Sequence, residues 1–421
     1  MLTDSGAGTY CQPLFRLGTQ KKSPPTAAMR TRKRPRCWQP NYLPAVTTIV
    51  RLANSAATLS RRSAPPHVPI RGTGALTRRA HSNLPMSESA SKLPVSIEDV
   101  HQALPRVRAA LAATPLYQWG GLTDLLGFPF YLKHENHQPI GAFKVRGGIN
   151  LVAATAGAHH EGGIWGVSTG NHGQSLAYAA RRAGIPCTIV VPTGNNPDKN
   201  AAILRLGAKL IEKGRDFDAA REHVEELARR AAGRYVHSAN EPLLIAGVAT
   251  MAWEIFEELP QPDVILVPIG LGSGVCGTCL VAKHRHPQTQ VIGVQARGAA
   301  AVARSWQTGQ TQLDANCDTW AEGMATRVPA EMTLEIMRAL MDDVILVDDD
   351  QLRHASYLIL KHTHNLAEGA GSAALAAALA ERQRFAGRHV VGILSGGNLD
   401  LAVLPSILAA AKSAKLPENP L

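Results

Sequence analysis

Lys144 is the residue whose surroundings best suit covalent chemistry. It is the only lysine between Lys133 and Lys199, and its neighbours are small or apolar: Gly141, Ala142, Phe143, Val145, Gly147 and Gly148. Loss of hydration in such surroundings lowers the pKa of an amine and frees it to form a Schiff base with a carbonyl compound. A solvated lysine at the start of a helix is the alternative interpretation, because most lysines lie at the surface.

A glycine-rich loop at residues 270–277 follows an all-apolar strand expected at 264–267. Its glycines let backbone N–H groups approach an anion closely, and the helix that it opens adds a positive dipole. The loop also matches the dinucleotide pattern G-x-G-x-x-G, which requires an acid after the next strand. Gln295, Ala296 and Arg297 stand there instead. A single phosphate group is therefore the better fit, and a plain strand–helix turn remains the alternative.

The turn at residues 168–173, with the sequence S-T-G-N-H-G, also follows an expected strand and opens an expected helix. It is therefore a second candidate anion site. Two anion sites and one activated lysine suit a phosphorylated aldehyde cofactor together with the carboxylate of a substrate. His172 in this turn is as compatible with capping or packing as with catalysis.

These residues need a scaffold, and the sequence predicts one in which short strands alternate with helices. Helices are expected at 96–113, with Ser96 as N-cap, and at 144–154, 174–183, 197–206, 216–232 and 244–258. Strands are expected at 130–133, 164–167, 187–191, 209–212, 235–237, 264–267, 291–294, 344–347 and 390–394. Short strands rich in Val and Ile predict an α/β fold with mostly parallel sheets covered by helices.

The basic charge of the chain is confined to its first part. The 421 residues carry a formal net charge of +11, yet no Asp or Glu stands between Ser5 and Ser87, where fourteen Lys or Arg occur. With Asp4, residues 1–87 carry a net +13, which leaves −2 for the rest of the chain. This near-neutral remainder argues against a nucleic-acid-binding face. The sequence contains no apolar run of about 18 residues, so no membrane span is expected.

Residues 1–85 form a leader rich in Arg, Ser, Thr and Pro, without a sustained apolar period, and this composition predicts disorder. Three interpretations stay open: an extension upstream of a natural start at Met86, an organelle transit peptide, or a functional basic arm. None of the three adds an element to the expected fold.

The six cysteines are few for a chain of this length. They predict a reducing, cytoplasmic location and no disulfide framework. Cys276 and Cys279 form a lone C-x-x-C at the start of an expected helix. A metal site would need further ligands at suitable spacing, so neither a metal nor a redox role is expected.

Four motifs, taken in order, resemble those of fold-type II pyridoxal-phosphate enzymes, in particular the threonine/serine dehydratase and serine racemase family. They are H-E-N-H-Q-P-I-G-A-F-K-V-R-G-G at 134–148, S-T-G-N-H-G at 168–173, G-L-G-S-G at 270–274 and S-G-G-N at 395–398. The resemblance extends over residues 93–404, and four ordered motifs make it specific.

The resemblance implies roles for individual residues. Lys144 would bind pyridoxal phosphate covalently and serve as the catalytic base, Phe143 would pack against the ring, Asn171 would bind the ring hydroxyl, and Ser395 would face the pyridine nitrogen. The phosphate would be held by Gly270, Leu271, Gly272, Ser273 and Gly274. The substrate would be bound by Ser168, Thr169, Gly170, Asn171 and His172, of which Ser168 and Thr169 are also catalytic candidates.

The resemblance also implies dehydration and deamination of a β-hydroxy amino acid, such as L-threonine or L-serine, to a 2-oxo acid and ammonia. A hydroxyl group beside the ring nitrogen leaves the ring neutral, which favours loss of a β-substituent over transamination. Residues 237–248 resemble dehydratases linked to hydroxyectoine utilisation and to phenylserine, so a hydroxyectoine-derived or aryl substrate is an alternative. Racemisation or β-replacement on the same scaffold is another. A third alternative is a non-catalytic binding protein whose basic arm recruits nucleic acid.

By the same resemblance, residues 86–165 and 242–421 would form a large cofactor-binding domain, and residues 166–241 a small mobile domain. Relatives are usually homodimers or homotetramers. We therefore expect a homo-oligomer that binds a small amino-acid substrate and neither nucleic acid nor a membrane.

Two departures from the family pattern concern function. Thr169 stands where racemase-type members carry a second serine, which puts racemisation in doubt. Gln295 and the alanines at 299–301 stand where relatives place the acids of a divalent-cation site, so no bound metal ion is expected. The pairs Glu322-Gly323 and Glu368-Gly369 lie in loops that line the pocket in relatives.

Overall fold

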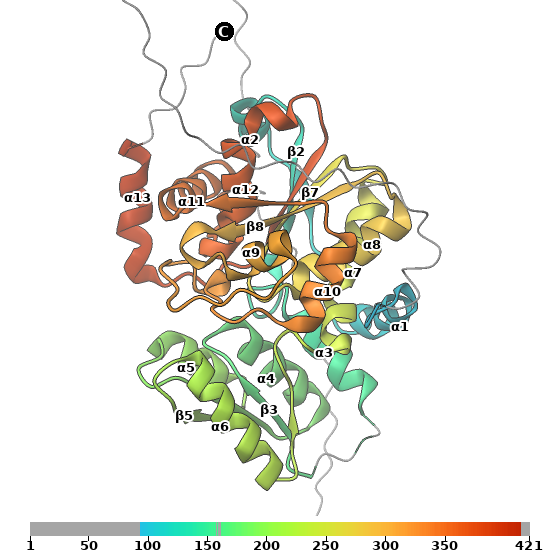
Figure 1. Cartoon of the computed structure of the whole chain (residues 1–421), viewed down its shortest axis with the longest axis vertical. Coiled ribbons are helices and arrows are strands. Elements are labelled where there is room, and N and C mark those ends of the chain that lie inside the picture. Colours follow the sequence, from blue (N-terminus) through green and yellow to red (C-terminus); the bar gives the residue numbers. More distant parts are fainter. Residues whose placement is uncertain (1–92, 157, 159–160, 414–421) are drawn as a thin grey trace, which may run out of the picture. The chain divides into compact units, whose positions relative to one another are not determined.

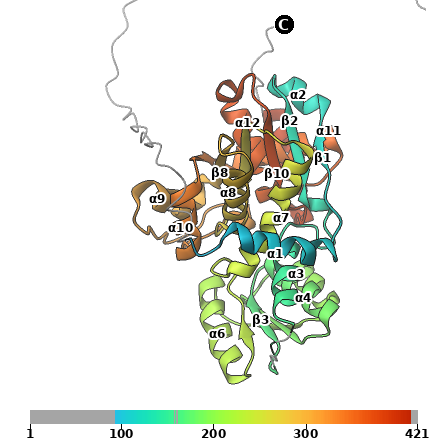
Figure 2. The same ribbon diagram turned by 90° about the vertical axis from the view of Figure 1, so that its right-hand side faces the viewer.

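The computed structural model describes residues 93–156, 158 and 161–413, and within them the strands form two sheets. The first sheet has the order β1 (Leu116–Gln118), β2 (Phe130–His134), β10 (Val390–Leu394), β7 (Val264–Pro268), β8 (Gln290–Ala296) and β9 (Asp343–Val347). The second has the order β5 (Lys209–Glu212), β4 (Cys187–Val191), β3 (Ile164–Val167) and β6 (Arg234–Tyr235). Helices surround both sheets (Figures 1 and 2), which confirms the predicted α/β architecture.

The strands pair in parallel, as predicted, except at one edge of the six-stranded sheet. There β1 runs antiparallel to β2, with Leu116 opposite Lys133. The sequence did not predict β1, because three residues are too few to show the alternation of a strand. In the centre of the sheet, Val390 of β10 lies opposite both Phe130 and Val264.

Alternating side chains of the six-stranded sheet enter two separate cores. Ile265 and Val267 pack with α1 (Ile97–Arg108), α7 (Pro242–Glu258), α8 (Ser273–Arg285) and α10 (Glu331–Leu340). Val264 and Leu266 pack on the opposite face with α2 (Gly120–Leu126), α11 (Asp349–Thr363) and α12 (Gly369–Ala380). Because successive side chains of a strand point to opposite faces, a strand buried on both faces must be apolar throughout.

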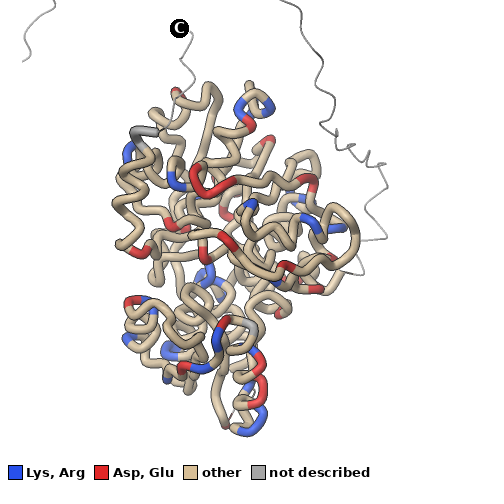
Figure 3. The backbone as a smooth tube through the Cα atoms, turned by 60° about the vertical axis from the view of Figure 1, so that its left-hand side comes forward, with Lys and Arg blue, Asp and Glu red and all other residues tan. Residues whose placement is uncertain are grey.

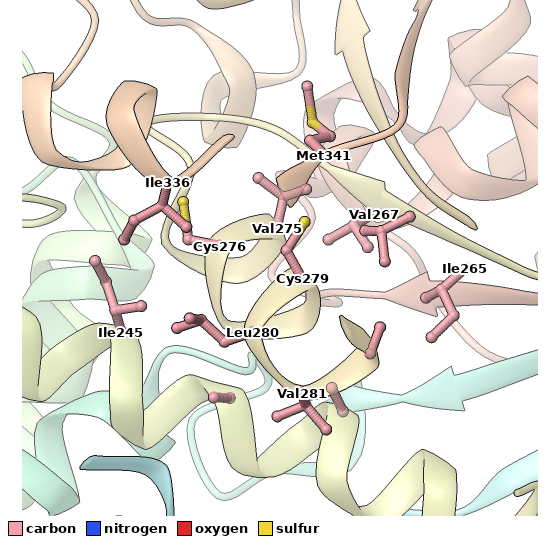
Figure 4. Packing of buried hydrophobic residues seen from close by; sticks show 14 of the residues in the cluster. Ile245, Ile265, Val267, Val275, Cys276, Cys279, Leu280, Val281, Ile336 and Met341 are labelled. Atoms are coloured by element: carbon pink, nitrogen blue, oxygen red, sulfur yellow. The ribbon is translucent and has the colours of Figure 1, made fainter. Parts of the chain in front are cut away.

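Cys276 and Cys279 belong to the first of these cores. Figure 4 shows both side chains on α8 among Val275, Leu280 and Ile336. Both thiols are fully buried, and burial raises the pKa of each above its usual range. Their place in the core explains the C-x-x-C as packing.

The four-stranded sheet is built on the same principle. Ile189 faces α4 (Asn171–Ala183) and α5 (Pro197–Arg205), and Val190 faces α6 (Phe217–Arg230). The helix α3 (Val145–Ala154) packs between α4 and α7 and so joins the two halves of the fold. Glycine permits this close contact: a Cβ at Gly148 would lie 2.4 Å from the Oγ of Ser175 on α4.

Several expected element bounds differ from the observed ones. Ser96 caps α1, and its hydroxyl accepts a hydrogen bond from the Asp99 N–H, as predicted, but α1 ends at Arg108 and not at 113. The helix α4 begins at Asn171, three residues earlier than expected, which places Asn171 and His172 in its first turn. Two further described helices, α9 (Ala301–Thr308) and α13 (Leu404–Ser413), complete the fold.

The expected division into a large domain (86–165 and 242–421) and a small mobile domain (166–241) stays a prediction. The four-stranded sheet begins at Ile164, and α3, expected in the large domain, packs on α4 of that sheet. Figure 3 shows acidic and basic residues interspersed along the described chain. No helix among the described residues is long and apolar enough to cross a membrane. The leader at 1–85 lies outside the described residues.

Candidate active site

Loops that follow parallel strands surround a cavity of about 770 Å³. β2, β10 and β7 are neighbours and run in the same direction, so the chain leaves all three at one edge of the sheet. The segments that follow them carry Lys144, Ser395 and Gly270, and the turn after β3 of the other sheet brings Ser168 to the same cavity. Parallel α/β sheets bind ligands at this edge.

Lys144 lies at the start of α3 with its amine inside the cavity. The amine donates hydrogen bonds to the Ser273 hydroxyl at 2.7 Å and to the Ser238 carbonyl at 3.4 Å, and it lies 5.2 Å from the centre of the Phe143 ring. No carboxylate pairs with it among the described residues, and burial lowers its pKa to about 8. These surroundings favour an activated amine over a solvated lysine.

The backbone around Lys144 is held from two directions. The Phe143 N–H donates to the Ser395 carbonyl at 3.0 Å, and Ala142 forms an antiparallel bridge with Gly396. From α4, the Ser175 hydroxyl donates to the Lys144 carbonyl at 2.6 Å. The lysine is therefore tied both to the end of β10 and to the helix that follows β3.

The glycine loop forms the N-terminus of α8. Gly272 has φ of 103°, and a Cβ there would lie 2.9 Å from Thr333 Cβ. The first backbone bond that closes the helix runs from Cys276 N–H to the Gly272 carbonyl. The N–H groups of Ser273, Gly274 and Val275 therefore have no carbonyl partner within the helix. Such free N–H groups at a helix start can bind a phosphate.

The turn after β3 forms a second helix N-terminus, at α4. The Ser168 hydroxyl accepts a hydrogen bond from the Gly170 N–H at 3.0 Å, and the Thr169 carbonyl accepts one from the Asn195 amide at 3.4 Å. The first closing bond of the helix runs from Gln174 N–H to the Gly170 carbonyl, so the N–H groups of Asn171, His172 and Gly173 have no carbonyl partner within the helix and can bind a carboxylate.

His172 is buried beside this turn. Burial, together with the charge of Lys144, lowers its pKa to about 3, so the imidazole is neutral at physiological pH. Its Nε2 lies 3.4 Å from the Val236 carbonyl. Of the two interpretations that the sequence left open, packing has the support of this contact.

Asn171 is held at both ends of its side-chain amide. Its Nδ2 donates to Glu368 Oε1 at 2.8 Å, and its Oδ1 accepts from Asn398 Nδ2 at 2.7 Å. Burial raises the pKa of Glu368 to about 7. Ser395 is buried at the cavity wall, and its hydroxyl has no hydrogen-bond partner among the described residues.

Sequence reasoning missed several residues that line the cavity, chiefly the segment after β4. Asn195, Asn196 and Lys199 reach the cavity there, and the Lys199 amine donates to Glu322 Oε2 at 2.6 Å. The rule that ligands bind beyond the carboxyl ends of parallel strands, applied to β4, could have found this segment.

Gln295 stands where the resemblance places an acid of a cation site. It is fully buried, and its Oε1 accepts a hydrogen bond from the Ala303 N–H at 2.8 Å. Within the described ranges no group of three or more His, Cys, Asp or Glu could hold a metal ion. That the protein binds no metal stays a prediction.

Comparison with known proteins points to one family. Residues 107–396 match the family model described as pyridoxal-phosphate dependent enzyme. The L-threonine ammonia-lyase of Thermotoga maritima is 32% identical over 314 residues, which cover 75% of this chain and 78% of that protein. A solved structure of threonine deaminase isoform 2 from Solanum lycopersicum has a TM-score of 0.71 and 30% identity over 75% of this chain and 93% of that one. Maize serine racemase has a TM-score of 0.71 and 28% identity, with coverages of 76% and 98%.

The cavity fits the cofactor of this family. The amine of lowered pKa suits the aldehyde of pyridoxal phosphate, and the helix N-terminus built from glycines suits its phosphate. The Ser395 hydroxyl, which has no partner in the described part of the chain, would suit the ring nitrogen. On the sequence match and this site, the chain belongs to the pyridoxal-phosphate dependent enzymes of the threonine/serine dehydratase family.

Proposed function

We propose that this protein dehydrates and deaminates a β-hydroxy amino acid, such as L-threonine or L-serine, to a 2-oxo acid and ammonia. The observation that carries the proposal is the placement of the Lys144 amine, with its lowered pKa, in one cavity with two helix N-termini. The names of the relatives, L-threonine ammonia-lyase and threonine deaminase, support this substrate class.

The residues divide into those that hold the cofactor and those that hold the substrate. Lys144, Phe143, Asn171 and Ser395 would hold the ring, and the phosphate would be bound by Gly270, Leu271, Gly272, Ser273 and Gly274. Bound pyridoxal phosphate supplies an electron sink for the bonds to the substrate Cα. Ser395 is the residue that would face the ring nitrogen, and because its hydroxyl carries no charge, early loss of the β-hydroxyl would be favoured.

The substrate carboxylate would lie at the start of α4, with the Ser168 hydroxyl and the backbone of Thr169, Gly170, Asn171 and His172 around it. In this placement the Cα–H bond would face the Lys144 amine, which can take the proton because its pKa lies near the working pH. Removal of the Cα proton and departure of the β-hydroxyl as water would together form the Cα=Cβ bond. The released enamine would then add water and give the 2-oxo acid and ammonia.

The test is turnover of purified protein loaded with pyridoxal phosphate. We expect L-threonine to give 2-oxobutanoate and ammonia in equal amounts, and Lys144→Ala to give neither while the chain stays folded. If the protein binds the cofactor but releases no ammonia from threonine or serine, hydroxyectoine-derived and aryl β-hydroxy amino acids come next. If none of these amino acids released ammonia, the proposal would be wrong.

Racemisation is a second candidate because the maize serine racemase structure is similar. A racemase needs a base on the face of Cα opposite Lys144, and Thr169 is a candidate because it lines the cavity in the turn before α4. Since threonine replaces the serine of racemase-type relatives, we expect D-serine to form from L-serine more slowly than ammonia. Chiral chromatography of the reaction mixture measures both products.

We further propose that the protein acts as a homo-oligomer in the cytoplasm. Leu401 and Leu408 are 63% and 48% exposed and offer apolar surface to a second copy. None of the four described cysteines forms a disulfide, which suits a reducing compartment. Light scattering after size exclusion tests the assembly, and imaging of a C-terminally tagged chain tests the location.

A further inference from the structure

The side chain of Asn171 has a defined orientation because two different partners bind its two ends. Asn398 Nδ2 donates both to Asn171 Oδ1, at 2.7 Å, and to the Ile140 carbonyl, at 2.8 Å. The carbonyl oxygen can only accept, so it identifies the donating end of Asn398 and, through it, the accepting end of Asn171. Asn171 Nδ2 is therefore the donor, and Glu368 Oε1 accepts a hydrogen bond from one of its two hydrogens at 2.8 Å.

The second Nδ2 hydrogen of Asn171 has no acceptor among the described residues, although Asn171 lines the cavity. An amide donor at a cavity wall can bind a ligand oxygen. Because two neighbours already fix the orientation of this amide, little conformational entropy is lost on binding. In the cofactor-loaded enzyme this donor would meet the ring oxygen of pyridoxal phosphate.

Glu368 is itself held in place. A Cβ at Gly396 would lie 2.3 Å from Glu368 Oε1, so the carboxyl group fits against a position that only glycine leaves open. The charged groups that act on it are Lys199 of α5 and Glu322 of η4 (Glu322–Met324), and burial raises its pKa to about 7. The carboxyl group therefore changes its protonation within the pH range in which such an enzyme works.

We propose that Glu368 is a positioning residue: it fixes the Asn171 amide for the ring oxygen of the cofactor, and its charge adjusts the pH at which the bound cofactor loses a proton. A carboxylate one hydrogen bond behind the contacting amide favours the protonated form of the cofactor. The inference rests on cofactor binding alone. Its tests use no amino-acid substrate, so failure of the proposed dehydration would leave it standing.

The first test is a double-mutant cycle on cofactor affinity, measured by titrating cofactor-free protein with pyridoxal phosphate. Glu368→Ala and Asn171→Ala should each weaken binding by about five- to tenfold, the worth of one hydrogen bond. In the Asn171→Ala background, Glu368→Ala should have no further effect, because the residue acts through Asn171. Glu368→Gln keeps an acceptor oxygen and should restore the wild-type affinity. Additive losses would overturn the proposal.

The second test is the pH midpoint of the absorbance band of bound pyridoxal phosphate. Glu368→Gln removes the negative charge, so the midpoint should fall by about one unit. The matched control is Glu322→Gln, which removes a carboxylate from the same cavity that bonds Lys199 and not Asn171. Its midpoint should move by less than half as much. Equal shifts in the two variants would mean a general effect of charge, and the proposal would be wrong. Thermal unfolding shows that each variant is folded.

Discussion

At the scale of single residues, the reactivity of Lys144 follows from what surrounds its amine. An amine with an ordinary pKa of 10.5 is almost wholly protonated at neutral pH and cannot attack a carbonyl carbon. Burial lowers the pKa of Lys144 to about 8, so roughly one molecule in ten carries the free amine at pH 7. Its hydrogen bond to the neutral Ser273 hydroxyl does not stabilise the charge as a carboxylate would.

The lowered pKa predicts how the cofactor enters. The rate at which cofactor-free protein takes up pyridoxal phosphate should rise with pH through about 8 and then level off, because only the unprotonated Lys144 amine reacts. Growth of the absorbance band after mixing, recorded between pH 6 and pH 10, measures this. A rate that still rises in proportion to hydroxide at pH 10 would indicate an unperturbed lysine. Lys144→Arg should show no covalent uptake at any pH.

At the scale of elements, buried charges anchor the helix that carries Lys144. Arg146, in the first turn of α3, pairs with Glu135 at 2.7 Å and with Glu254 at 2.6 Å. Lys133 of β2 pairs with Glu254 at 2.8 Å. The side chains of Arg146 and Glu135 are fully buried, so the network joins α3, the end of β2 and α7 in the protein interior.

Removal of Arg146 should therefore be costly. Arg146→Met leaves two buried carboxylates with one cation fewer, and we expect the free energy of unfolding to fall by about 3–5 kcal/mol. The matched control is Arg108→Met: Arg108 pairs with Glu257, but both side chains are more than 40% exposed. That variant should lose less than about 1 kcal/mol. Urea denaturation of both variants measures these free energies of unfolding. Equal losses in the two variants would show that the network does not stabilise the fold.

The glycine loop gives a second prediction at this scale. Gly272→Ala forces a Cβ into a left-handed backbone with φ of 103° and to within 2.9 Å of Thr333. We expect a loss of about 1–3 kcal/mol of stability and weaker binding of pyridoxal phosphate, because the α8 N-terminus must shift. Gly309→Ala is the control: φ is 75°, but open space surrounds the position. It should lose stability while the cofactor affinity stays unchanged.

The sequence could predict what is local and not what depends on distant pairing. Strands such as Val390–Leu394 are all-apolar and bounded by turns, and Lys144 and the glycine loop are recognisable from their immediate neighbours. By contrast, Lys199 meets Glu322 across 123 positions, and Asn171 meets Glu368 across 197. No local pattern marks such a pair. The edge strand β1 was missed for another reason: its three residues are too few to show the alternation of a strand.

At the scale of the whole molecule, the catalytic part should not depend on the leader. The family match covers residues 107–396, and the chain after residue 87 carries a net charge of −2. We expect a protein that begins at Met86 to bind pyridoxal phosphate and release ammonia at the rate of the full chain. Salt-sensitive DNA binding by the full chain that the shorter protein lacks would support the interpretation of the leader as a functional arm.

The order of strands in the six-stranded sheet bears on how the chain folds during synthesis. β2 pairs with β10, so Phe130 cannot pair until Val390 has been synthesised. The strands of the four-stranded sheet, by contrast, all lie between Ile164 and Tyr235. On the ribosome the smaller sheet can therefore close early, while the edge of β2 remains exposed until the last strand emerges. The Phe143 N–H bonds to Ser395, so the lysine loop also gains its partner at that late point. Nascent chains shorter than about 395 residues should thus hold a folded small sheet and no cofactor site, and they are the species most in need of a chaperone.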